Sequence, residues 1–154
     1  MTMIRRQPVL SRKPAHLVLS LSLFAAMTTP AFSEGLNDLL NHGAEAYERG
    51  NYADAARQYR KVLSQDSQHP VARMGLAKAL LAEGKTEEAK AQLLQLTQEH
   101  PDFGAAYYLL GTVYEKEGNP TQAREAYQRY VQHSKGSIPP DPAIRLKLRQ
   151  YGVL

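Results

Sequence analysis

The sequence predicts an all-α fold built from helical repeats. Three segments follow the same pattern at a period of 34 residues, which is typical of helical repeat arrays. Within each segment, apolar residues are spaced three and four positions apart, and this spacing places them on one face of a helix. Glycine recurs where the first helix of each segment should end, at Gly50, Gly84 and Gly118. Each repeat is therefore expected to be a pair of helices stacked against its neighbours.

The register of the repeats is set by positions that keep their character in all three copies. One position in each of the two helices is always small, and two further positions of the second helix are large. We expect the small residues of paired helices to face one another, so that the backbones come close, while the large residues fill the space on either side. In repeat order, these positions are Gly43, Ala77 and Gly111; Ala55, Ala89 and Ala123; Tyr59, Leu93 and Tyr127; and Val62, Leu96 and Tyr130.

Proline marks the joints between the repeats. His69-Pro70 and His100-Pro101 fall between successive copies, and a residue that precedes proline avoids helical geometry. Asn119 followed by Pro120 suits the N-cap and first residue of a helix. The repeats are predicted to span about 36–69, 70–103 and 104–135, within a domain of residues 34–135.

These residues resemble the tetratricopeptide repeat, a helix hairpin of 34 residues with conserved small, glycine, alanine and aromatic positions. The resemblance covers residues 36 to about 135 and implies a right-handed superhelical solenoid that binds proteins and has no catalytic activity. Three residues depart from the family pattern, one of which is Ser67 in place of the usual proline in the first repeat. His42 stands where an apolar residue is usual, and Arg73 occupies the fourth position of the second repeat.

In this family the first helix of each repeat lines a concave groove, so the resemblance implies a partner-binding surface here. Leu40, Met74 and Tyr108 occupy equivalent positions and would form an apolar, partly aromatic stripe. The alternative is that Leu40, Met74 and Leu81 only pack between neighbouring first helices. The lysine and asparagine pattern with which some members grip an acidic C-terminal peptide is missing. The candidate groove residues are Asn37, Leu40, Ala44, Tyr47, Val71, Met74, Lys78, Leu81, Tyr108, Thr112 and Glu115.

A linker and a last helix are predicted after the repeats, within residues 136–154. The helix begins at Asp141 and Pro142 and carries Ile144, Leu148 and Tyr151 on one side. One interpretation is a capping helix that covers the last apolar face of the stack. The other is a basic amphipathic helix that docks on a membrane or a partner. The helix has few apolar residues for interfacial binding, which favours the cap.

Residues 1–33 have the organisation of a secretory signal peptide. Basic residues precede an apolar run from Leu17 to Met27, and small residues follow, with cleavage expected after Ser33. A membrane-spanning helix needs roughly 20 apolar residues, so this run is short for a permanent anchor. The alternative is an uncleaved anchor. We expect an exported bacterial protein, periplasmic or secreted, with no stable membrane anchor once the signal is removed.

Composition argues against several other functions. Outside residues 1–33, basic and acidic residues are equal in number, so there is no excess positive charge for nucleic acid. The chain contains no cysteine, hence no disulfide and no thiolate ligand. Equivalent histidines of successive repeats lie too far apart to share a metal ion. No nucleophile motif or phosphate-binding loop is present, so neither catalysis nor a cofactor is expected.

We therefore predict a protein-interaction module of the cell envelope that holds a segment of an unidentified protein in its groove. One alternative is a structural scaffold that self-associates through the solenoid ends. Another is an accessory subunit of an envelope enzyme or assembly complex.

Overall fold

Seven α-helices make up the described part of the chain, and no strand occurs there, which confirms the predicted all-α fold. The computed structural model describes residues 35–134 and 142–154, all within one compact unit of residues 34–154. The expected signal peptide, the expected linker and the Asp141 N-cap lie outside the described residues. The helices are α1 (Leu36–Glu48), α2 (Tyr52–Gln65), α3 (Pro70–Ala82), α4 (Thr86–Glu99), α5 (Gly104–Lys116), α6 (Pro120–His133) and α7 (Pro142–Gln150).

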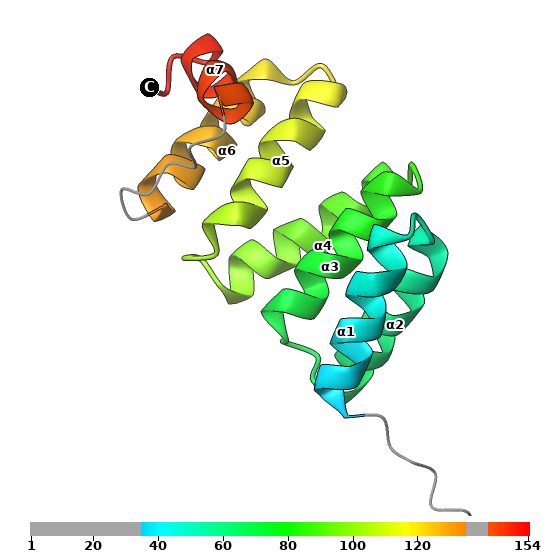
Figure 1. Cartoon of the computed structure of the whole chain (residues 1–154). Coiled ribbons are helices and arrows are strands. Elements are labelled where there is room, and N and C mark those ends of the chain that lie inside the picture. Colours follow the sequence, from blue (N-terminus) through cyan, green and yellow to red (C-terminus); the bar gives the residue numbers. More distant parts are fainter. Residues whose placement is uncertain (1–34, 135–141) are drawn as a thin grey trace, which may run out of the picture. The chain divides into compact units, whose positions relative to one another are not determined.

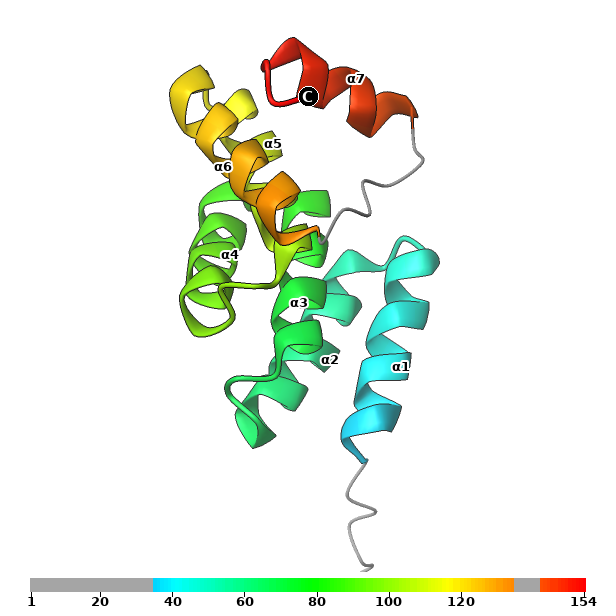
Figure 2. The same ribbon diagram turned by 90° about the vertical axis from the view of Figure 1, so that its left-hand side faces the viewer.

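The first six helices form three successive hairpins, as the repeat pattern predicts (Figure 1). Within each hairpin the first helix ends at a glycine in the left-handed region, with φ of 77°, 79° and 72° at Gly50, Gly84 and Gly118. These angles are strained for any residue with a Cβ, so glycine is the residue that allows the tight turn. Helices α1 and α3, the first helices of two hairpins, lie side by side (Figure 2).

Local side chains fix the start of two helices. The Asn51 side chain accepts a hydrogen bond from the Asp54 amide at the start of α2, and His69 Nδ1 accepts one from the Ala72 amide at the start of α3. Asn119 stands at the N-cap of α6, as predicted, but its side chain donates to Glu117 instead of capping the helix.

Aromatic rings fill the space that glycine leaves between the helices. A Cβ built on Gly43 would lie 2.8 Å from Tyr59 Cε1, and one built on Gly111 would lie 2.4 Å from Tyr127 Cε1. Tyr59 also lies against the next hairpin, because a Cβ on Gly75 would be 2.4 Å from its Cζ. The small residues of the first helices therefore face the large residues of the second helices, whereas the sequence pattern predicts that the small residues face one another.

The second repeat reaches the same packing with a different pair of residues. Ala77 replaces the glycine, Leu93 replaces the tyrosine, and both side chains are completely buried. A larger residue on the first helix is thus accompanied by a smaller one on the second, as a close-packed interior requires.

Gly75→Ala is expected to destabilise the protein by about 1–3 kcal/mol through overpacking against the Tyr59 ring. At a helix position with free space around it, the same change stabilises by about 1 kcal/mol. The sign of the change in unfolding free energy therefore shows whether the new methyl group is crowded. Adding Tyr59→Leu removes the ring that the new Cβ would meet, so the two changes together should cost less than the sum of the single changes. Urea unfolding measures both variants. Gly104→Ala is the control because its Cβ would meet its nearest atoms at an ordinary 3.4–3.5 Å.

A buried arginine ties the two helices of the second hairpin to each other and to the turn that precedes them. Arg73 is buried, with 4% of its surface exposed, and its guanidinium donates to Gln92 Oε1 at 3.3 Å and to the Ser67 carbonyl. It also lies 3.1 Å from Glu99 Oε2. One side chain of α3 thereby holds the turn that precedes it and two positions of α4, which explains why this arginine departs from the family pattern.

Among the described residues, no helix combines the length and apolar character needed to cross a membrane. The part of the chain that the structure describes also holds no cluster of histidine and acidic side chains suited to a metal ion. Two of the described histidines make contacts between different segments of the chain. His100 Nε2 hydrogen-bonds the Gln68 carbonyl at 2.9 Å, and the His133 ring stacks on Tyr107.

Candidate partner-binding groove

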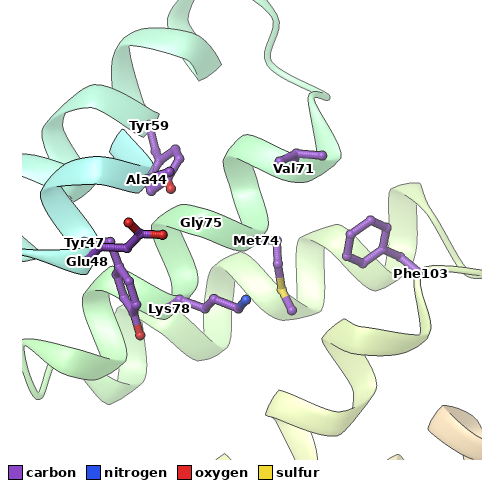
Figure 3. A pocket seen from close by; sticks show the side chains of 9 residues that line it. All are labelled: Ala44, Tyr47, Glu48, Tyr59, Val71, Met74, Gly75, Lys78 and Phe103. Carbon is purple, nitrogen blue, oxygen red and sulfur yellow. The ribbon is translucent and has the colours of Figure 1, made fainter. Parts of the chain in front are cut away.

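The first helices of the first two hairpins, α1 and α3, border an open hollow of about 250 Å³ (Figure 3). Three consecutive elements supply its walls, and Phe103, which precedes α5, closes one side. We call this the first hollow. It is lined by Ala44, Tyr47 and Glu48 of α1, Tyr59 of α2, Val71, Met74, Gly75 and Lys78 of α3, and Phe103.

A second hollow of about 290 Å³ adjoins the first. Both are lined by Met74 and Lys78, so the two hollows share one wall and together form the groove. The second hollow is bounded on its other sides by α5, α6 and α7. Its remaining lining residues are Ala105, Tyr108, Leu109, Tyr130 and Ile144.

The structure brings six of the candidate groove residues together around these hollows. Val71 is 54% exposed, whereas Met74 is only 8% exposed. Met74 therefore belongs mainly to the core, and only a small part of its side chain lines the groove. The six are Ala44, Tyr47, Val71, Met74, Lys78 and Tyr108.

The other five candidates lie outside both hollows. Asn37 is exposed on the first turn of α1, and Leu40 and Leu81 are half-buried against the core. The Thr112 hydroxyl donates to the Leu109 carbonyl at 2.7 Å. Glu115 pairs with Lys147 of α7.

Sequence reasoning missed several lining residues. The repeat pattern predicts a packing role for Tyr59, and its ring does pack between helices, but it also borders the first hollow. Gly75 leaves room beside it, because a Cβ there would collide with the ring. The sequence holds a usable indication for Phe103, which is an aromatic residue at a joint between repeats. It holds no such indication for Ile144, because the repeat pattern does not determine the position of α7.

Two charged residues border the otherwise apolar first hollow, and each is exposed. The side chains of Glu48 and Lys78 make no hydrogen bond or ion pair with any other residue that the structure describes. Burial raises the pKa of the nearby Tyr59 hydroxyl, and Tyr47 and the negative charge of Glu48 raise it further. Tyr59 therefore stays protonated at neutral pH and is available as a hydrogen-bond donor.

Helix α7 covers the inner side of the third hairpin. Leu148 is completely buried, and the Tyr151 ring lies 5.1 Å from that of Tyr127. Glu115 accepts a hydrogen bond from the Tyr127 hydroxyl at 2.7 Å and pairs with Lys147 Nζ at 2.6 Å. This packing places α7 on the last hairpin, and Ile144 of α7 lines the second hollow.

The carboxyl of Glu115 makes the stability of the contacts between α7 and the third hairpin depend on pH. Burial acts to raise its pKa, but hydrogen bonds from Lys147, Tyr127 and Tyr151 outweigh burial, so that the pKa is lowered from 4.5. A carboxyl whose pKa is lowered by folding adds stability that is fully present above its unfolded pKa. That stability is lost as the pH falls through the folded pKa.

Glu115→Gln is therefore expected to destabilise the protein at pH 7, with the difference from wild type shrinking below about pH 4.5. Urea unfolding at several pH values between about 3 and 7 measures this difference. Glu125→Gln, at an exposed position of α6, is the control and should show no such narrowing. A constant gap for Glu115→Gln at all pH values would contradict the assignment.

Comparison with known proteins supports the repeat assignment. Two sequence models, both described as tetratricopeptide repeat, match residues 46–113 and 105–137 and together span more than half of the chain. The chain belongs to the tetratricopeptide repeat family.

Two curated relatives show where such repeats occur. TPR repeat-containing thioredoxin TTL4 of Arabidopsis thaliana is 33% identical over 82 residues, which is 53% of this chain and 12% of the relative. Cellulose synthase operon protein C of Xanthomonas axonopodis pv. citri is 30% identical over 155 residues, 90% of this chain and 10% of the relative. The chain thus spans only about a tenth of the length of these proteins.

Solved structures share the fold. The Sgt2 TPR domain from Aspergillus fumigatus superposes with a TM-score of 0.69 at 23% identity, over 76% of each chain. The first TPR of Spaghetti (RPAP3) bound to an HSP90 peptide gives 0.67 at 20% identity, over 76% of this chain and 90% of that one. The Yersinia enterocolitica chaperone SycD in complex with a peptide of the translocator YopD gives 0.64 at 14% identity, over 76% and 86%.

Proposed function

We propose that this protein is a non-catalytic interaction module that holds a segment of a partner protein in its groove. The observation that carries the proposal is the first hollow, an open and mainly apolar space on the inner face of a tetratricopeptide repeat domain. Val71 leaves more than half of its surface in water there. Burying such an apolar side chain against a partner is favourable, because it removes apolar surface from water.

Relatives of the same fold support a peptide as the partner. The RPAP3 domain and SycD are each described in complex with a peptide, of HSP90 and of YopD respectively. A groove of this kind takes an extended or helical segment through a few buried side chains. The partner of this chain has its own chemistry, because the lysine and asparagine pattern of acidic-tail binders is missing from the inner helices.

We place the protein in the bacterial cell envelope. The support is the order of basic, apolar and small residues within 1–33, which is that of a secretory signal peptide. Fractionation of cells that express the full chain tests this placement, and the proposal is wrong if the protein stays in the cytoplasm at its full mass.

Site-directed photocrosslinking tests the groove. A photoreactive phenylalanine analogue replaces Val71 in the first hollow or, as a matched control, Arg57 on the exposed side of α2. We expect a discrete crosslinked protein from position 71 only, abolished when Ala44→Asp is added to the same chain. Equal crosslinking from both positions would place the contact elsewhere. Met74 is unsuitable for such tests because its replacement disturbs the core.

A further inference from the structure

The two charges at the first hollow restrict the kind of segment that fits it. Glu48 comes from the last turn of α1, and Lys78 comes from the middle of α3. Figure 3 shows the amine of Lys78 pointing toward Met74 and away from the side of the hollow where Glu48 lies. Lys78 and Met74 also line the second hollow, so the positive charge lies where the two hollows meet.

Neither charge is satisfied by the residues that surround it. Within the described residues, Glu45, one turn before Glu48, pairs with Arg49 at 2.8 Å, whereas Glu48 has no such partner. On α3, Arg73 is paired with Glu99, whereas Lys78 is not paired with any described residue. Both groups are at present solvated, since both are exposed.

A bound segment changes that solvation. An apolar side chain seated between Val71, Met74 and Phe103 would exclude water from the hollow and from the charges at its edges. A charge that loses water without gaining a partner opposes binding, whereas a complementary charge on the segment restores the lost interaction. Like charges placed opposite each other exclude unsuitable segments.

We infer that the groove selects a protein segment in which an apolar anchor is flanked by a basic residue on one side and an acidic residue on the other. The basic residue meets Glu48, and the acidic residue meets Lys78. This inference rests on the proposed function and specifies the partner of the same groove. Because a segment can lie in either chain direction, the charge content around the anchor is selected, and the order of the charges along the segment is not.

Selection from a random peptide library displayed on phage tests the inference, with the full chain and its variants as immobilised baits. Wild type should enrich peptides that carry one basic and one acidic residue around an apolar anchor. Lys78→Glu should shift the selection to two basic residues, and Glu48→Lys should shift it to two acidic residues. The double variant should return to mixed charge. Each ion pair between a peptide charge and residue 48 or 78 of the bait is expected to raise the enrichment of that peptide by about two- to fivefold, the range for partly exposed ion pairs.

Matched controls make the same changes of charge away from the groove. Glu45→Lys on α1 and Lys85→Glu before α4 lie outside the lining of the first hollow and should select the same peptides as wild type. If all baits select the same charges while Val71→Asp abolishes selection, the groove binds segments but the charge inference is wrong. If Val71→Asp selects the same peptides as wild type, or wild type selects none, the proposed groove function fails as well.

Discussion

Tyr127→Ala is expected to destabilise the protein by about 3–5 kcal/mol, the range for removing a large buried aromatic side chain. The Tyr127 side chain is completely buried, and its ring occupies the space beside Gly111. It also lies 5.8 Å from the ring of Tyr108 and 5.1 Å from that of Tyr151. Its removal leaves a cavity where α5, α6 and α7 meet, so we expect α7 to lose its docking site.

Urea unfolding followed by far-ultraviolet circular dichroism measures the loss of stability. Because the chain has no tryptophan, tyrosine signals in the near ultraviolet report directly on this aromatic cluster. Tyr127→Phe is the matched control. It keeps the ring and removes the hydroxyl that donates to Glu115, for which we expect a loss of about 1.5 kcal/mol. If the phenylalanine variant loses as much as the alanine variant, the hydrogen bond dominates and the packing argument is wrong.

The repeat could be predicted from the sequence because its determinants are local. Gly50, Gly84 and Gly118 end helices for a reason that depends only on their own backbone angles. The apolar spacing fixes which face of each helix is buried, and residues such as Leu80, Ala89 and Leu93 are buried as that spacing requires.

Pairings between repeats were harder to predict because they depend on side-chain shape. Tyr59 reaches both Gly43 of its own hairpin and Gly75 of the next, and no periodicity reveals a contact across hairpins. The same holds for α7. The sequence pattern identifies its apolar side chains. Its position against Glu115 and Tyr127 depends on one ion pair and one aromatic contact, and neither contact has an equivalent in the repeat pattern.

Only part of the candidate groove could be predicted, because the exposure of its residues also depends on side-chain shape. Family positions identify which residues of the first helices face inward, and Ala44, Val71 and Lys78 do line the groove. They do not say how much of each side chain remains exposed. Met74 and Val71 are both inward-facing, yet the first is 8% exposed and the second 54%, because Met74 packs on the core of the third hairpin.

Arg73→Ala is expected to destabilise the protein by roughly 3 kcal/mol, since it removes one partner of a buried ion pair. The change leaves the Ser67 carbonyl and Gln92 Oε1 without their donor and Glu99 without its counter-charge. The Glu99 side chain is 20% exposed, so water partly replaces the arginine, and we place the loss at the lower end of the range for buried pairs. Arg73→Lys should be intermediate, because a single amine cannot reproduce the planar fork of donors.

The pair formed by Arg60 and Glu88 is a natural control, since it too is an ion pair between two helices, in this case α2 and α4. Its atoms lie 3.4 Å apart, and its side chains are 50% and 59% exposed. Arg60→Ala should therefore change stability by less than about 1 kcal/mol. A double-mutant cycle with Glu99→Gln isolates the coupling of Arg73 to Glu99, expected at about 0.5–3 kcal/mol. Equal losses for Arg73→Ala and Arg60→Ala would show that burial is not what makes the Arg73 contact strong.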